Sequence, residues 1–130
     1  MRTRFVILAV FGLCTILACA KKASPEECQQ AVGNLSKLLG KYVVKQMKKN
    51  INLESPAAAD AQKDMDAQLK RIDESTGLEG ADPRNFEVCA KQKRTLVICV
   101  STAKTLEETI QACGMKQSGS SADLTVSWPD

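Results

Sequence analysis

Apolar side chains recur every three to four positions through the middle of the chain, which is typical of amphipathic helices. The first such stripe follows a helix-start signal: Ser24 can cap, Pro25 suits the first helical position, and Glu27 completes a capping box. We therefore expect a helix over about residues 25–50. Its apolar stripe consists of Cys28, Val32, Leu35, Leu39, Tyr42 and Val43.

A second helical stripe follows a repeat of the same signal. Ser55 and Pro56 form another cap-plus-proline pair, and apolar positions continue at helical spacing behind it. This pattern predicts a helix over about residues 56–75. Gly77 is suited to stop it, with residues 76–81 as a loop.

Shorter helical segments are predicted further along. Asp82-Pro83 is a third start signal, for a helix that ends near Gln92, and Thr95 can cap the next helix. The run from Thr105 to Glu108 is a further capping box. Gly114 is a plausible stop for that last helix.

Residues 115–130 turn small and polar, which predicts a flexible tail. Its tip alternates apolar and polar residues from Leu124 to Trp128, a strand-like pattern that offers an alternative: a short peptide that adds a strand to a partner's sheet edge. The expected fold is all-α, a small disulfide-stabilised helical bundle over residues 24–114 with a flexible N-terminal tether and C-terminal tail.

The N-terminal segment has the composition of a secretory signal peptide. Arg2 and Arg4 precede an uncharged run from Phe5 to Ala18. That run is shorter than the roughly 20 residues that a membrane-spanning helix needs. We therefore assign residues 1–18 as a signal peptide.

The end of this run, Ile16-Leu17-Ala18-Cys19, resembles the bacterial lipobox. The resemblance implies that Cys19 carries the acyl chains of a lipoprotein and becomes the new N-terminus, with residues 19–23 as a lipidated tether. Cys19 is followed by Ala20 and Lys21, with no Asp at the second position, so the resemblance also implies outer-membrane sorting. The alternatives are ordinary cleavage within residues 15–20, which would give a soluble secreted protein, and an uncleaved anchor.

Charge and composition exclude several functions. The chain has 18 Lys+Arg, 15 Asp+Glu and no His. Without Arg2 and Arg4 the basic residues number 16, so nothing favours nucleic-acid binding. The absence of His excludes Ser-His-Asp and Cys-His catalysis. No metal site, catalytic residue or cofactor other than the lipid is expected, and we predict that the protein is not an enzyme.

Of the six cysteines, Cys14 lies within the signal peptide and would leave with it, and Cys19 is the lipid site. The four that remain indicate two disulfides in an exported chain. Cys89 and Cys99 flank the break near residues 93–94 at equal distances, so an antiparallel helical hairpin would pair them and leave Cys28 with Cys113. The alternative considered is Cys28–Cys99 with Cys89–Cys113. The spacing lacks the Cys-x-x-Cys of a thiol oxidoreductase and the close pairs of a zinc site.

The cysteine spacing, with the run Cys-Val-Ser-Thr-Ala-Lys-Thr-Leu over residues 99–106, resembles small helical lipoproteins of myxobacteria, related delta-proteobacteria and spirochaetes. This resemblance covers roughly residues 1–40 and 85–114. It implies a helical, disulfide-linked module anchored in the cell envelope, and it implies no specific activity.

Candidate contact residues follow from charge and aromaticity. A lysine face on the first helix and the single Trp128 in the tail are the candidates. The face consists of Lys37, Lys41, Lys45 and Lys48, with Lys49 beside them. We expect an envelope lipoprotein that acts as a structural or binding module, with an envelope protein or an anionic headgroup as partner. The alternatives are a periplasmic thiol-redox or other enzyme and a soluble secreted binding protein.

Overall fold

The computed structural model describes residues 22–130, and the predicted signal peptide and Cys19 lie outside the described residues. The described chain is mostly helical with one small sheet, which confirms the all-α prediction. Its elements are α2 (Pro25–Lys49), α3 (Ala58–Glu74), α4 (Pro83–Ala90), α5 (Arg94–Thr102), α6 (Leu106–Gln111), β1 (Lys116–Ser118) and β2 (Thr125–Ser127).

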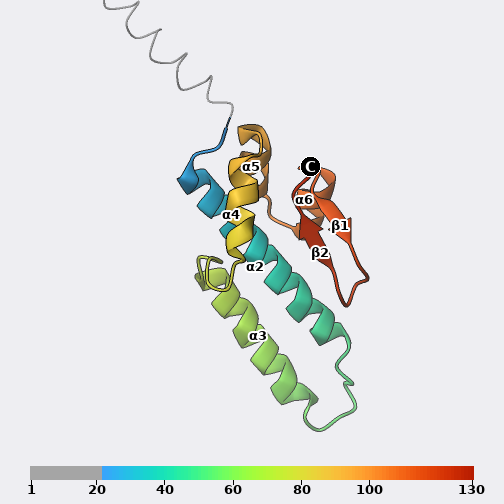
Figure 1. Ribbon diagram of the computed structural model, residues 1–130. Helices are drawn as coiled ribbons and strands as arrows, with labels where there is room; N and C mark the ends of the chain where they lie inside the picture. The colour runs from blue at the N-terminus through green and yellow to red at the C-terminus, as the bar shows by residue number, and fades with distance from the viewer. Residues whose placement is uncertain (1–21) are drawn as a thin grey trace, which may run out of the picture.

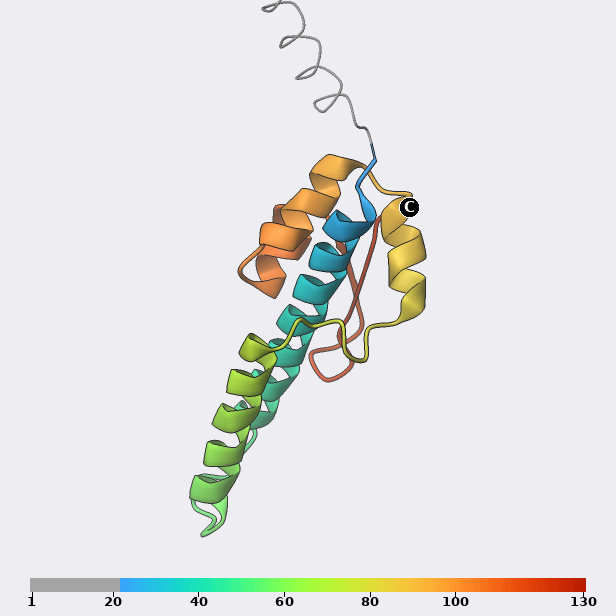
Figure 2. The same ribbon diagram turned by 90° about the vertical axis from the view of Figure 1, so that its left-hand side faces the viewer.

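Helix α2 is the axis of the molecule, because α3, α4, α5 and α6 all pack against it (Figure 1). Helix α3 runs back along the C-terminal half of α2 and forms with it a long two-helix arm. Helices α4 and α5 lie on opposite sides of the N-terminal half of α2 (Figure 2). The arm therefore projects away from a more compact end that holds the shorter helices.

The start of α2 follows the sequence signal. The Ser24 hydroxyl accepts a hydrogen bond from the Glu27 backbone N–H at 3.2 Å, and Pro25 is the first helical residue. The Glu27 carboxylate is bound to the Arg94 Nε at 3.0 Å, which ties the first turn of α2 to the start of α5. Helix α2 ends at Lys49, within one residue of the expected end.

The predicted start of α3 is two residues early. Ser55 and Pro56 lie in turns, and the helix begins at Ala58 after Ala57, which makes no side-chain cap. The reason is local: the Asn52 side chain accepts from the Glu54 N–H, and its carbonyl accepts from the Ser55 N–H, so these residues complete a tight connection instead.

The chain leaves α3 through Gly77, as the sequence predicts, with a positive φ of 74°. This loop crosses α2 at Gly33, and a Cβ at either glycine would collide with the backbone of the other segment. The two glycines therefore allow the close crossing that leads the chain into α4.

Two of the three downstream caps are as predicted. The Asp82 carboxylate accepts from the Arg84 N–H at 3.0 Å, and the Thr105 hydroxyl accepts from the Glu108 N–H at 3.1 Å. The exception is Thr95, which lies inside α5 because the helix already begins at Arg94, after Lys93 and without a side-chain cap. The Leu96 and Val97 N–H groups both donate to the Lys93 carbonyl, so the first helical turn forms ahead of Thr95.

The core lies between α2 and the short helices. Ala31, Val32 and Leu35 of α2 pack with Val97 and Val100 of α5, and all five are almost fully buried. In the first half of α2, the predicted apolar stripe is therefore the face of the helix that packs into the core. All the elements named above, both disulfides and this core lie within residues 22–130.

Residues 115–130 differ from the flexible tail that the sequence predicts. Strands β1 and β2 form an antiparallel hairpin in which Gln117 faces Val126. The alternation from Leu124 to Trp128 does mark a strand, but its partner is β1 of the same chain. Its apolar side chains point to the core, where Trp128 is only 5% exposed. The helical domain predicted over residues 24–114 therefore extends through the hairpin.

Both predicted disulfide pairings are wrong. The structure joins Cys28 to Cys89 and Cys99 to Cys113, with Cα–Cα distances of 5.9 and 5.6 Å. The prediction assumed that α4 and α5 pack against each other as a hairpin. Instead each packs against α2, which lies between them (Figure 2), so Cys89 meets α2 and Cys99 meets the segment after α6.

Candidate functional site

The lysines of the face predicted on α2 do not all have the same surroundings: some contact α3, and others border a groove on α2. Lys41 forms an ion pair with Asp73 of α3, and the Lys37 Nζ donates to the Asp73 carbonyl at 2.8 Å. Lys48 pairs with Asp66 at 2.7 Å. These three lysines therefore connect α2 to α3 rather than forming one free cationic surface.

The Lys41–Asp73 pair predicts a pH dependence of stability. The hydrogen bond from Lys41 holds the pKa of the Asp73 carboxyl below its ordinary value of 3.8, and the charges of Lys37 and Lys45 act in the same direction. A carboxyl whose pKa is lowered by folding stabilises the fold above its unfolded pKa, and this contribution is lost as pH falls through the folded value. We expect the melting temperature to fall more for the native chain than for Asp73→Asn between about pH 5 and pH 2.

Circular dichroism at each pH measures this difference. Asp82 and Asp130 also have lowered pKa values, through Arg84 and Lys116, and they remain in the variant. The comparison therefore isolates Asp73. Asp64→Asn, an exposed position on the same helix, is the matched control. Parallel melting curves for native chain and Asp73→Asn at all pH values would contradict the prediction.

The remaining lysines border a groove between α2, α6 and the hairpin. Its volume is about 400 Å³. Its apolar surface comes from Leu38 and Tyr42 of α2, Leu106 and Ile110 of α6, and Leu124 beside β2. Helix α2 and the later segment from α6 to the hairpin, far from it in sequence, thus build one site, which sequence reasoning did not predict.

The rim of this groove is basic. Lys41, Lys45 and Lys49 follow each other along α2 at intervals of one helical turn, and Lys104 faces them from the α5–α6 connection. Glu107 is the one acidic residue among the lining side chains. Lys41 is engaged by Asp73, whereas Lys45, Lys49 and Lys104 make no ion pair within residues 22–130. The groove therefore presents three available ammonium groups beside apolar side chains.

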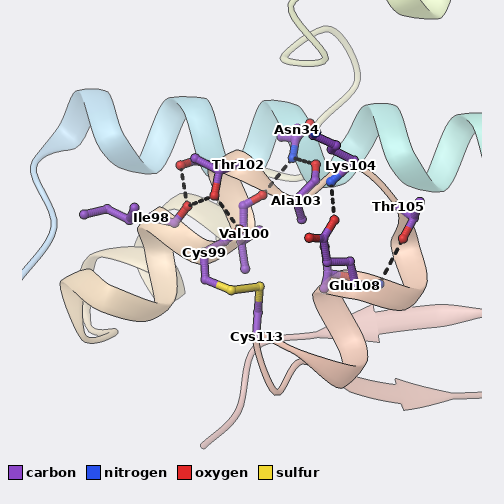
Figure 3. Close-up of a disulfide and its surroundings, with 12 residues drawn as sticks. Asn34, Ile98, Cys99, Val100, Thr102, Ala103, Lys104, Thr105, Glu108 and Cys113 are labelled. Atoms are coloured by element: carbon purple, nitrogen blue, oxygen red, sulfur yellow. Dashed lines mark hydrogen bonds between the residues drawn. A yellow bond between two sulfur atoms is a disulfide. The ribbon is translucent and has the colours of Figure 1, made fainter.

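Asn34 positions the segment that carries Lys104. Its side-chain amide donates to the Val100 carbonyl at 2.7 Å and to the Ala103 carbonyl at 2.8 Å (Figure 3). These bonds satisfy carbonyl groups at the end of α5, where a helix leaves them without partners. Asn34 escaped sequence analysis because a polar residue within a helix gives no sign of its tertiary partner.

The Cys99–Cys113 disulfide holds the other side of the same segment (Figure 3). It joins α5 to the second residue after α6, so the α5–α6 connection lies within a loop that the disulfide closes. The Glu108 carboxylate also accepts from the Lys104 backbone N–H at 2.7 Å. The wall of the groove formed by α6 is therefore fixed relative to α2.

Trp128, the other predicted contact residue, directly follows β2, is buried in the core and is unsuited to a surface contact. Its indole Nε1 has no hydrogen-bond partner within the described chain. The large aromatic side chain instead closes the core, which otherwise consists mainly of small aliphatic residues. The prediction that Trp128 is a surface contact residue is therefore wrong, because its side chain is part of the core.

The described residues offer few other sites. Cys28, Cys89, Cys99 and Cys113 are all engaged in disulfides. Residues 22–130 contain no group of three or more His, Cys, Asp or Glu placed to hold a metal ion. Among the helices of the same residues, none has the length and apolar character to cross a membrane. Cys19, the predicted lipidation site, lies outside the described part of the chain.

Comparison with known proteins finds no relative that could help to interpret this site. No protein-family model matches the chain. No curated protein and no solved structure matches it either. The resemblance to small envelope lipoproteins therefore stays a prediction, and the groove has to be interpreted from its own residues.

Proposed function

We propose that this protein is a lipid-anchored lipoprotein of the bacterial outer membrane that acts as a binding module. The groove between α2, α6 and the hairpin is its binding surface. The observation that carries the binding role is the set of three available lysines beside an apolar floor in one preformed hollow. The anchor rests on the lipobox-like sequence that ends at Cys19.

The position of the groove relative to the N-terminus supports this arrangement. The described chain enters at Lys22 and α2 begins at Pro25, so only a few residues separate Cys19 from the fold. The groove is lined by α2 residues from Leu38 to Lys49. A helix rises about 1.5 Å per residue, so the near end of the groove lies about 20 Å along α2 from its start. An anchored chain would thus hold the groove apart from its attachment point.

Intact-mass measurement on protein purified from membranes tests the anchor. We expect the mass of residues 19–130 plus acyl chains, with four cysteines alkylated only after reduction. Cys19→Ala should abolish membrane association, because more than one acyl chain is what makes such anchoring stable. Cys14→Ala is the matched control, since Cys14 lies within the predicted signal peptide.

The other outcomes identify the alternatives. A mature chain without acyl groups would favour a soluble secreted binding protein. Cysteines that are alkylated without reduction would favour a thiol-redox role. Either result would overturn the proposed function as stated.

A further inference from the structure

The groove also indicates the chemistry of its ligand. We propose that it binds one free anionic amphiphile, a single alkyl chain with a phosphate or carboxylate head, and this inference rests on the proposed binding function. The alkyl chain lies on the apolar side chains and the head contacts the lysines on the rim.

Charge selects the head group. Lys45, Lys49 and Lys104 line the groove from α2 and from the α5–α6 connection, and none forms an ion pair within the described residues. Lys45 also acts at longer range on Asp73 of α3. Glu107 balances only part of this charge. Three ammonium groups around one hollow favour an anion, and each supplies hydrogen-bond donors only. A neutral or cationic head would leave these donors without a counter-charge.

The apolar floor selects the alkyl chain. Tyr42, Ile110 and Leu124 line the groove with half-buried side chains, and the almost fully buried Leu38 and Leu106 complete its apolar lining. An inorganic anion would contact the lysines and leave this floor exposed to water, whereas burial of each methylene contributes roughly 0.8 kcal/mol. The floor and the rim together therefore fit an amphiphile better than either part alone.

The size of the groove argues for a small ligand. Its volume of about 400 Å³ lies towards the low end of small-molecule sites, which hold about 300–1,000 Å³. A partner helix with its side chains is about 10–12 Å across and needs a longer trough. One alkyl chain with a compact head matches the hollow.

The place of the groove argues for a free amphiphile rather than a lipid within the bilayer. It lies along the second half of α2, away from the end at which the chain enters the fold. The lysines nearest that end, such as Lys22, are not part of the groove. A ligand that reaches the groove therefore has to leave the membrane or come from solution.

Calorimetric titration with decyl phosphate below its micelle concentration tests the proposal. The protein used begins at Ala20, because residues 22–130 contain the core and both disulfides and because the absence of Cys19 removes competing acyl chains. Circular dichroism and the absence of free thiols verify its fold. We expect one site, with hexyl phosphate bound at least about tenfold more weakly because fewer methylenes are buried. Decanol and inorganic phosphate should each bind at least about tenfold more weakly as well.

A charge variant and a matched control locate the site. Lys45→Gln with Lys49→Gln should weaken decyl phosphate binding about tenfold. Lys63→Gln with Lys91→Gln removes the same charge from exposed positions outside the groove and should leave binding unchanged. All four substitutions are at exposed side chains, so the fold is expected to persist.

Five results would overturn the proposal. Three are no binding of decyl phosphate, equal binding of decanol or inorganic phosphate, and equal loss in both double variants. The fourth, binding to anionic phosphatidylglycerol vesicles alone, would favour a membrane headgroup. The fifth, preferential binding of an oligoglutamate peptide, would favour an acidic protein partner. Because the anchor is tested separately by intact mass and fractionation, failure here is distinguishable from failure of the proposed function.

Discussion

Replacement of Cys28 and Cys89 by alanine is expected to lower the free energy of unfolding by about 4 kcal/mol, as the chain-entropy model gives for a loop of this length. The bridge joins residues 61 positions apart and fastens α4 to the first turn of α2. Replacement of Cys99 and Cys113, which are 14 positions apart, should cost less, about 3 kcal/mol. Urea denaturation followed by circular dichroism measures both values.

The size of the first effect approaches the total stability of a small domain, which is about 5–15 kcal/mol. The Cys28–Cys89 double variant should therefore be partly unfolded at elevated temperature, while the Cys99–Cys113 variant keeps the contact between α2 and α4. Peptide mapping without reduction provides an independent control on the pairing. A peptide that joins Cys89 to Cys99 would contradict the arrangement, as would a larger loss of stability from the shorter bridge.

Replacement of Trp128 by alanine is expected to lower the free energy of unfolding by about 3–5 kcal/mol, as large-to-small substitutions in a core do. Trp128 is 5% exposed, and together with Met115 it flanks the paired ends of β1 and β2 and belongs to the core. Its removal leaves a cavity at the end of a core with few other large side chains. Urea denaturation by circular dichroism measures this loss.

Trp128→Phe is the matched control for this prediction. It keeps an aromatic ring and removes the Nε1 group that has no partner in the described chain. Its cost should be clearly smaller than that of Trp128→Ala, because less volume is lost and no buried donor remains unsatisfied. An alanine variant as stable as the native chain would show that residues 115–130 are the flexible tail that composition suggests.

Local signals in the sequence were sufficient for most of the secondary structure. The Ser24 and Thr105 caps act at the backbone N–H groups that their spacing predicts, and Gly77 adopts the positive φ of a helix stop. Such signals work because capping involves only neighbouring residues. The start predicted at Ser55-Pro56 was wrong for an equally local reason. Asn52 accepts a hydrogen bond from the Glu54 N–H, and the residues before α3 form a turn instead of the first turn of the helix.

The candidate site was only partly predictable. Lys41, Lys45 and Lys49 could be placed on one helix face because helical periodicity depends on spacing alone. Their division could not be predicted, since Lys41 turns to Asp73 on α3 while Lys45 and Lys49 border the groove. The apolar lining of the groove could not be predicted either, because it includes residues of α6 and the hairpin. The positions of these elements depend on the path of the chain around α2.

The amino-acid sequence by itself therefore determined the all-α class, the helix positions and the presence of two disulfides, because these follow from periodicity, local caps and an even number of cysteines. Only the tertiary structure decided that Cys28 meets Cys89, that Trp128 closes the core, and that three lysines face an apolar hollow. The physical reason is that α2 lies between α4 and α5. A helix that intervenes in space leaves no trace in the spacing of the residues it separates.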